Sequence, residues 1–264
     1  MKNIVLLGAT GSIGDSCLNV IRQNKEDFHL LGIGLDSNLD KAHKIAKEFR
    51  PDHIFVAKSD FDKSHDLVHS YPNILSTEDE LQGLIQDPSV DIVVSAISGF
   101  AGLKASYFAI DAGKTVLIAN KESIVAAGDI LMPLAKSKNS EIIPVDSEHN
   151  AIHQCLPAYR DISEISKIII TASGGPFREK TFQDLSTVSL QDALKHPTWS
   201  MGTKITIDSA TLVNKCLELI EAHYLFQIPE SLIEIVVHPQ SIIHSMVTFI
   251  DGSTIAQLSN PNME

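Results

Sequence analysis

The stretch IVLLGATGSIG, residues 4–14, decides the fold of the first half of the chain. Its apolar run predicts a buried strand, and Gly8, Gly11 and Gly14 at three-residue spacing predict a tight turn into a helix. Such glycines also let a pyrophosphate approach the backbone and the N–H groups at the start of the helix. An ordinary strand-to-helix turn can carry similar glycines. The surrounding sequence therefore has to distinguish a dinucleotide-binding turn from an ordinary one.

Apolar runs and helical stretches alternate up to residue 146. Continuous apolar runs are typical of parallel strands that helices cover on both faces. Helical periodicity extends over 38–49 and 101–112, and Gly113 stands where the second helix would stop. The predicted strands are Asn3–Gly8, His29–Leu35, His53–Ala57, Asp91–Ala96, Thr115–Ala119 and Glu141–Val145. This order predicts an α/β domain over residues 1–146, with a doubly wound parallel sheet of the Rossmann type that binds a dinucleotide.

The pattern changes after Asp146. Strands are predicted at Lys167–Thr171, Lys204–Ile207, Leu232–His238 and Ser245–Ile250, with a helix over Ser209–Phe226. A second, strand-rich domain of the α+β class is therefore expected over residues 147–264.

Composition excludes some classes of partner. The chain has 264 residues and a net charge of −12, which argues against non-specific binding to nucleic acid or to an anionic membrane. Its three cysteines are far apart and form no Cys-x-x-Cys pair, as in proteins of the reducing cytoplasm. A strand that starts at residue 4 leaves no room for a signal peptide, and no apolar stretch reaches about 18 residues. We expect a soluble, cytoplasmic protein.

The end of the second predicted strand leaves the choice of dinucleotide open. An acid about twenty residues beyond the glycines usually holds a ribose hydroxyl and favours NAD, whereas a basic or small hydroxyl residue suits the 2′-phosphate of NADP. Asp36 therefore favours NAD, whereas Ser37 suits NADP. Asp36 is equally consistent with a residue that only ends a strand.

The stretch PVDSEHNAIHQCLP, residues 144–157, sets Asp146 and Glu148 two positions apart. In an extended segment such residues point the same way. Two carboxylates about 4 Å apart repel by about 4 kcal/mol at an effective dielectric constant of about 20, so a divalent cation would stabilise the pair. The alternative is a solvated N-cap turn ahead of a helix over 151–156.

The predicted helix over 209–226 offers a third acidic ligand. Helical spacing places Val213, Cys216, Leu217, Ile220 and Tyr224 on one side and Asn214, Lys215, Glu218 and Glu221 on the other. The polar stripe is either the solvated side of the helix or the other half of a metal site.

Two stretches nearby suit an anion. Ser209 and Thr211 would stand at the positive N-terminus of that helix, with Lys215 one turn further on. The Ser173-Gly174-Gly175 turn would form a second cradle. A loop over 196–202 holds the single tryptophan, Trp199, and is a candidate to close over a ligand.

Seven stretches in this order closely resemble the 1-deoxy-D-xylulose 5-phosphate reductoisomerases, and the likeness covers nearly the whole chain. They are GATGSIG (8–14), ANKES (119–123), PVDSEHNAI (144–152), SGGPFRE (173–179), HPTWSMG (196–202), DSATLVNKCLELIEA (208–222) and HPQSIIHSMV (238–247). The family uses NADPH to make 2-C-methyl-D-erythritol 4-phosphate for isoprenoid synthesis, by an isomerisation followed by hydride transfer.

The resemblance implies a role for each matching residue. It implies a Mg²⁺ or Mn²⁺ ion held by Asp146, Glu148 and Glu218, and catalytic roles for Lys121, Ser147, Glu148 and His196. It implies substrate contacts from Ser147, Ser173, His196, Trp199, Ser209, Asn214, Lys215 and Glu218. Of these, Ser147 would contact the substrate hydroxyls, as Lys121 would, and Ser173, His196, Ser209, Asn214 and Lys215 would hold the phosphate. It implies a cofactor site lined by Gly8, Thr10, Gly11, Ser12, Ile13, Ser37, Asn38, Asn120 and Glu122.

The resemblance also implies a homodimer with a small phosphorylated sugar as substrate. Family members continue past a position usually occupied by Arg, here Glu264, into a helical C-terminal domain, so we expect this chain to lack that domain.

Two other functions are alternatives to a reductoisomerase: a catalytically silent nucleotide-binding fragment, or a semialdehyde dehydrogenase with a nucleophilic cysteine. The second is disfavoured by the apolar helical settings of Cys155 and Cys216, which are typical of core thiols.

Overall fold

The computed structural model describes residues 1–58, 60–71, 73–156, 161–195 and 202–260. The chain divides into two compact units, one covering Met1–Pro144 and the other starting at Val145. This division lies beside the predicted boundary at residue 146.

The first unit is built on a six-stranded sheet in the order β3-β2-β1-β4-β5-β6, and all paired strands are parallel. Its strands are β1 (Lys2–Leu7), β2 (Phe28–Leu35), β3 (His53–Val56), β4 (Ile92–Ser95), β5 (Thr115–Ile118) and β6 (Ile142–Pro144). The chain winds outward from β1 in one direction and then in the other, which confirms the predicted doubly wound sheet. Every predicted strand of this unit agrees with the structure to within one residue at each end.

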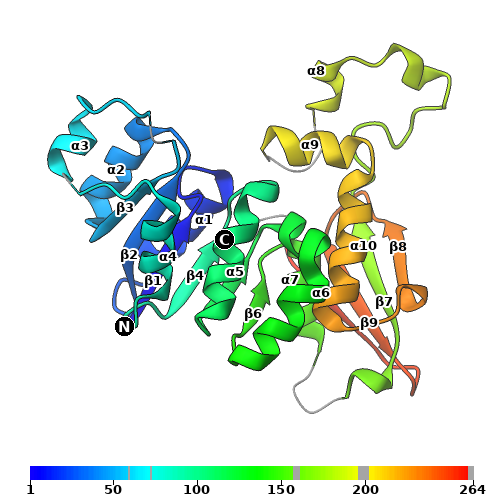
Figure 1. Ribbon diagram of the computed structural model, residues 1–264. Coiled ribbons are helices and arrows are strands. Elements are labelled where there is room, and N and C mark those ends of the chain that lie inside the picture. Colours follow the sequence, from blue (N-terminus) through cyan, green and yellow to red (C-terminus); the bar gives the residue numbers. More distant parts are fainter. Residues whose placement is uncertain (59, 72, 157–160, 196–201, 261–264) are drawn as a thin grey trace. The chain divides into compact units, whose positions relative to one another are not determined.

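Helices connect these strands (Figure 1). They are α1 (Ser12–Gln23), α2 (Leu39–Phe49), α3 (Asp66–Ser70), α4 (Glu78–Gln86), α5 (Leu103–Asp111), which a 3₁₀ turn precedes, and α6 (Lys121–Lys138). The helices predicted over 38–49 and 101–112 are confirmed as α2 and α5. Gly113 ends α5 with φ +67°, as its position predicted. Val5 and Leu6 point to opposite faces of β1 and are both fully buried, as expected for a sheet covered on both sides.

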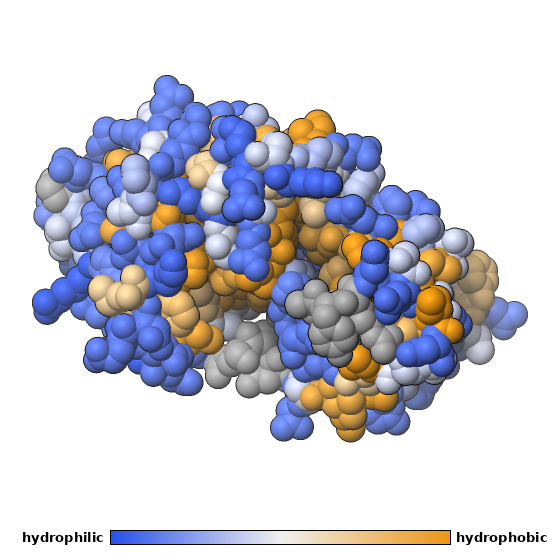
Figure 2. Space-filling model, turned by 90° about the horizontal axis from the view of Figure 1, so that it is seen from below, coloured by the Kyte–Doolittle hydropathy of each residue, from blue (hydrophilic) through white to orange (hydrophobic). Residues whose placement is uncertain are grey.

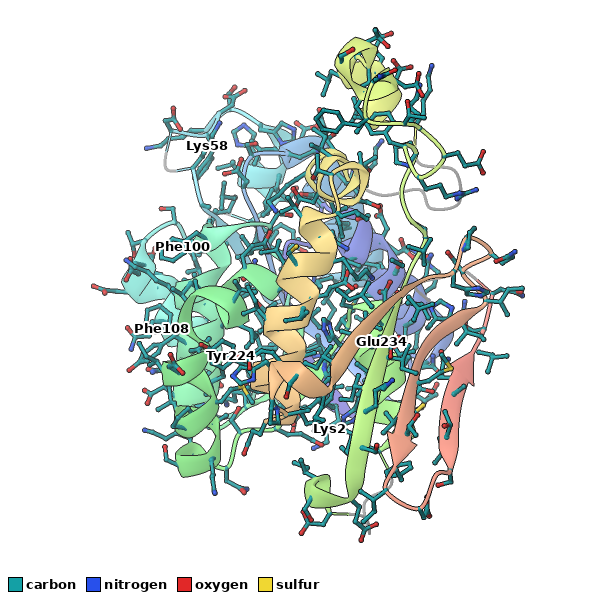
Figure 3. All side chains as sticks on the ribbon, turned by 90° about the vertical axis from the view of Figure 1, so that its right-hand side faces the viewer. Lys2, Lys58, Phe100, Phe108, Tyr224 and Glu234 are labelled. Carbon is teal, nitrogen blue, oxygen red and sulfur yellow. The ribbon has the colours of Figure 1, made fainter. Side chains whose placement is uncertain are left out.

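The second unit has a four-stranded mixed sheet in the order β10-β9-β7-β8. Its strands are β7 (Ile165–Ala172), β8 (Ile233–Val237), β9 (Ile243–Phe249) and β10 (Thr254–Leu258); its helices are α7 (Ser147–Cys155), α8 (Leu190–Ala193), α9 (Thr203–Ala210) and α10 (Val213–Phe226). Ile152 of α7 and Phe226 of α10 share one core with Ile168 and Val247, so both helices cover the same face of the sheet. Figure 3 shows α10, which carries Tyr224, against this sheet.

Three local predictions for this unit were wrong. Lys204–Ile207 is not a strand but part of α9, whose buried Thr206 and Ala210 are four residues apart, as on one helix face. The helix predicted over 209–226 is two helices, because Leu212 between them is left-handed, with φ +62°. The helix predicted over 151–156 begins at Ser147, so Asp146 and Glu148 do not lie in an extended segment.

Hydrophilic residues predominate on the face drawn in Figure 2, and apolar residues show between them. None of the helices in the described part of the chain combines the length and apolar character that crossing a bilayer requires.

Candidate active site

Two helices of the second unit bring the three predicted metal ligands together. Asp146 is the N-cap residue of α7 and Glu148 lies in its first turn, while Glu218 is on α10. One carboxylate oxygen from each lies within 4.8 Å of the others. The side chain of Asp146 makes no capping bond to its own helix, and one of its oxygens lies in the carboxylate cluster. Hard oxygen donors of this kind suit Mg²⁺ or Mn²⁺, and the ligand roles stay predictions.

Lys215 of α10 is the cation within this cluster. Its Nζ lies 2.9 Å from Oε1 of Glu148 and 2.5 Å from Oε2 of Glu218. It also donates a hydrogen bond of 2.6 Å to the carbonyl oxygen of Thr171. Burial would lower the pKa of Lys215, but the two carboxylates outweigh burial and raise that pKa to about 12. The ammonium group is therefore charged at neutral pH.

The polar stripe of α10 is its buried side. Lys215, Glu218 and Glu221 are at most 6% exposed, whereas Val213 is 46% exposed and Ile220 is 37% exposed. The interpretation of this stripe as a solvated face was therefore wrong. Buried charges are tolerated here because each has an oppositely charged partner or hydrogen bonds.

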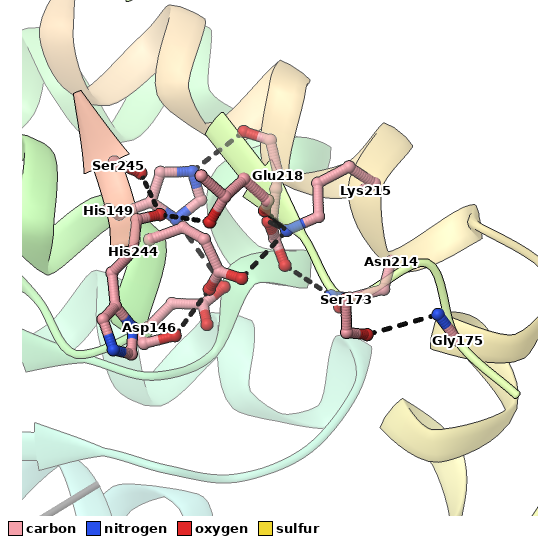
Figure 4. A network of polar contacts seen from close by, with 12 residues as sticks. Asp146, His149, Ser173, Gly175, Asn214, Lys215, Glu218, His244 and Ser245 are labelled. Atoms are coloured by element: carbon pink, nitrogen blue, oxygen red, sulfur yellow. Dashed lines mark hydrogen bonds and ion pairs between the residues drawn. The ribbon is translucent and has the colours of Figure 1, made fainter. Parts of the chain in front are cut away.

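Two further hydrogen bonds orient the carboxylates (Figure 4). The Ser147 hydroxyl donates to Oε2 of Glu148 at 2.6 Å, and the Asn214 amide donates to Oε1 of Glu218. Both donors belong to the predicted substrate-binding set. The structure thus places Ser147 and Asn214 beside the proposed metal ligands.

His149 was left without a role by the sequence and proves central to this network. The ring is fully buried, with Nδ1 3.1 Å from Oε2 of Glu221 and Nε2 2.9 Å from the carbonyl oxygen of Glu218. Burial would lower the pKa of His149, but the charge of Glu221 and the hydrogen bonds of Asp146 and Glu221 raise it well above its usual value. Asp146 and His149 are spaced i, i+3, and so are Glu218 and Glu221. Once both helices were known, this spacing would have predicted that His149 and Glu221 lie close together.

The predicted phosphate-binding turn approaches α9. The Gly175 N–H donates to the Ser173 hydroxyl at 3.2 Å, and a Cβ on Gly175 would come within 2.7 Å of the Ser209 carbonyl oxygen. Ser173 and Ser209 are therefore close to each other. Ser209 lies at the C-terminal end of α9 and not at a helix N-terminus, so the predicted helix-dipole contribution there was wrong. His196 and Trp199 lie outside the described residues.

The predicted cofactor residues of the first unit follow the carboxyl ends of its strands. Gly8, Thr10 and Gly11 form the turn after β1, and Ser12 and Ile13 begin α1. Gly8 has φ +88°, and a Cβ there would come within 2.3 Å of the Ala96 carbonyl oxygen, so the turn requires glycine.

The remaining cofactor residues follow β2 and β5. Asn38 caps α2 by accepting a hydrogen bond from the Lys41 N–H at 3.0 Å, and the Ser37 hydroxyl donates to Asp36 at 3.0 Å. Asn120 caps α6 and donates to the Gly99 carbonyl oxygen at 2.8 Å. Lys121 and Glu122 are the first two residues of α6. The carboxyl ends of parallel strands share one edge of a sheet, which is where dinucleotides bind in such folds.

Two of the three cysteines lack the thiolate character of a nucleophile. Burial raises the pKa of the Cys17 thiol to about 11 and also raises the pKa of Cys155, so both are protonated at neutral pH. Cys216 is exposed on α10, and its interpretation as a core thiol was wrong because the polar side of that helix is the buried one.

Known proteins resemble this chain over its whole length. A model of the 1-deoxy-D-xylulose 5-phosphate reductoisomerase family matches residues 4–128, and a model of that enzyme's C-terminal domain matches residues 142–226. The chain is 49% identical over 265 residues to the reductoisomerase of Caldanaerobacter subterraneus subsp. tengcongensis and 47% identical over 264 residues to that of a Geobacillus species. Each alignment covers 100% of this chain and 69% of the relative.

Solved structures show the same likeness. A crystal structure of DOX-P reductoisomerase in complex with NADPH, fosmidomycin and magnesium has a TM-score of 0.93 and 44% identity, and the match covers 100% of this chain and 67% of that one. The Zymomonas mobilis enzyme in complex with NADPH has a TM-score of 0.89 and 41% identity, with 99% and 68% covered. At this identity and coverage, the chain belongs to the 1-deoxy-D-xylulose 5-phosphate reductoisomerase family.

Proposed function

We propose that this protein is a metal-dependent reductoisomerase that converts 1-deoxy-D-xylulose 5-phosphate to 2-C-methyl-D-erythritol 4-phosphate with NADPH. The observation that carries the proposal is the convergence of Asp146, Glu148 and Glu218 from two helices, in a chain whose relatives carry this activity in their name. The reaction has two parts, a carbon-skeleton rearrangement and a hydride transfer. We assign the binding of NADPH to the first unit and the binding of metal and substrate to the second.

The three carboxylates are the proposed ligands of a magnesium or manganese ion. A structure similar to this one was solved with magnesium, and three oxygen donors within 4.8 Å fit such an ion. The bound ion would supply a positive charge that stabilises negative charge on the substrate oxygens during the rearrangement and polarises the carbonyl that accepts the hydride.

The residues around the ligands are proposed to bind and orient the sugar phosphate. Ser147, Asn214 and Lys215 lie beside the carboxylates, and Ser173 lies close to Ser209. Binding the phosphate away from the reacting carbons supplies interaction energy that holds those carbons in place. From the family resemblance, we include Lys121 as a contact to substrate hydroxyls, His196 as a phosphate contact and catalytic residue, and Trp199 as part of a loop over the substrate.

The first unit is proposed as the NADPH domain and the second as the catalytic domain. The turn from Gly8 to Ile13 would receive the pyrophosphate, Ser37 and Asn38 the adenosine ribose, and Asn120 and Glu122 the nicotinamide half. Similar structures contain NADPH, which supports this cofactor over NADH. We further propose that the protein acts as a cytoplasmic homodimer that engages neither nucleic acid nor membrane.

The experiment is to follow NADPH oxidation by the purified chain while substrate and metal are supplied separately and together. Turnover is expected only when 1-deoxy-D-xylulose 5-phosphate and Mg²⁺ or Mn²⁺ are both present, and excess EDTA should abolish it. Turnover that survives EDTA would contradict the proposal. Calorimetry that detects NADPH binding but no metal-dependent binding of substrate would identify a catalytically silent fragment instead.

A further inference from the structure

A second group of ionisable side chains adjoins the proposed metal ligands within the same unit. His149 lies one turn beyond Asp146 on α7, and Glu221 lies one turn beyond Glu218 on α10. Nδ1 of His149 is 3.6 Å from Oδ2 of Asp146 and 3.1 Å from Oε2 of Glu221. The ring therefore contacts one proposed ligand through its carboxylate and, through Nε2, a second ligand through its backbone carbonyl.

These contacts hold the imidazole in one orientation. The Glu218 carbonyl oxygen can only accept a hydrogen bond, so Nε2 carries a proton and donates it. Nδ1 faces the carboxylates of Asp146 and Glu221. The side chains of His149 and Glu221 are 0% and 1% exposed, so water cannot replace Glu221 as the partner of the ring. Burying a carboxylate this completely is unfavourable unless a partner compensates it, and the His149 ring lies 3.1 Å from it.

The same three residues have the ligand types of a second cation site. One atom each from Asp146, His149 and Glu221 lies within 4.8 Å of the others. The direct contacts of the His149 ring with Asp146 and Glu221 instead favour an orienting role for it. The Phe226 ring lies beside His149, with the two ring centroids 6.3 Å apart.

We propose that Glu221 is a positioning residue of the metal site. It holds the His149 ring, and that ring holds the Asp146 carboxylate together with the α10 backbone at Glu218. The two helices thus keep the spacing at which Glu148 and Glu218 reach one ion. Outer-shell carboxylates that orient a contact to a metal ligand act in this way. The inference rests on the proposed function, since it needs a metal at the three carboxylates.

The test measures metal binding directly and needs no turnover. Mn²⁺ is titrated by calorimetry into the metal-free chain, in wild type, in Glu221→Gln and in Glu234→Gln. The control makes the same substitution on β8, where Glu234 is half exposed and pairs with Lys167. We expect one Mn²⁺ per chain in all three proteins, with affinity at least about tenfold weaker in Glu221→Gln and unchanged in Glu234→Gln. NADPH affinity should be the same in all three.

Several outcomes would overturn the proposal. Wild-type Mn²⁺ affinity in a folded Glu221→Gln variant would make Glu221 a purely structural residue. Two Mn²⁺ per wild-type chain, falling to one in the variant, would make it a metal ligand. A wild type that binds no Mn²⁺ would overturn the metal site of the proposed function as well. If Glu221→Gln does not fold, Glu221→Asp, which keeps the charge but shortens its reach, should weaken Mn²⁺ binding about threefold, and unchanged binding would overturn the idea.

Discussion

The Lys215 ammonium lies 2.9 Å from the Glu148 carboxylate and so joins α10 to α7 across 67 positions of sequence. The side chains of Lys215 and Glu148 are only 8% and 17% exposed, and Glu218 on the other side of the ammonium is 1% exposed. A cation buried between two carboxylates stabilises both, and its removal leaves two like charges facing each other.

Lys215→Met should therefore destabilise the metal-free protein strongly. Methionine retains most of the side-chain volume, so the main change is the lost charge, and we expect the free energy of unfolding to fall by about 3 kcal/mol. Urea unfolding measures it. The control Lys167→Met breaks an exposed pair with Glu234 and should cost less than about 1 kcal/mol. Equal losses in the two variants would show that burial of the Lys215 pair has no special effect.

Glu218→Gln should abolish metal-dependent turnover while NADPH binding persists. The variant loses one of three anionic ligands, so we expect activity to fall by more than about a hundredfold. The proposed NADPH residues all belong to the other unit, and NADPH affinity, measured by cofactor fluorescence, should change less than about twofold. Equal loss of turnover and of NADPH affinity would instead identify Glu218 as a carboxylate that only supports the fold.

The glycines of the first turn should separate by function. A Cβ on Gly14 would come within 2.4 Å of the Ala9 carbonyl oxygen, whereas the nearest atom to a Cβ on Gly11 is 3.3 Å away. Gly14→Ala should therefore cost about 2 kcal/mol or more of stability. Gly11→Ala should fold with nearly wild-type stability but bind NADPH about tenfold more weakly, because the added methyl would stand where the pyrophosphate approaches. Thermal unfolding and NADPH titration of both variants check this; the reverse pattern would contradict it.

The sequence was sufficient to locate the first sheet because its strands are buried on both faces. A continuous apolar run such as IVLL at 4–7, followed by a glycine-rich turn, is typical of a buried parallel strand. The sequence was insufficient to distinguish a strand from a helix where apolar and polar residues alternate over only a few positions. KITI at 204–207 fits a strand as well as it fits α9, and the choice is made by the burial of Thr206 and Ala210, which depends on tertiary contacts.

The site shows the same limit. Helical spacing correctly grouped Lys215, Glu218 and Glu221 on one stripe of the helix. It did not predict which stripe of the helix is buried. Polarity normally decides that question, and here it misled because the compensating charges of Glu148 and His149 come from a helix about seventy residues earlier. Motif resemblance named the ligands, whereas the role of His149 required the distances.

We expect the residues after β2 and β3 to set the choice between NADPH and NADH. Ser37 donates its hydroxyl to Asp36, and the Lys58 N–H bonds to the Asp36 carbonyl oxygen at 3.2 Å, so Lys58 follows β3 beside the ribose end of the predicted site. Its exposed ammonium can attract the 2′-phosphate of NADPH. Lys58→Ala should weaken NADPH binding about fivefold and leave NADH binding unchanged. Lys44→Ala, an exposed lysine on α2, serves as control, and equal weakening of both cofactors would contradict the assignment.

The thiols should differ in reactivity by position. Cys17, with a pKa of about 11, is about one part in a thousand thiolate at pH 8, and Cys155 is buried with a raised pKa. Iodoacetamide should therefore modify the exposed Cys216 first, as peptide mass spectrometry of a time course would show. Labelling of Cys155 before Cys216 would contradict the burial described for α7. The matching activity test uses Cys155→Ala and Cys216→Ala: both should retain NADPH-dependent turnover, whereas its loss in either would revive a thioester mechanism.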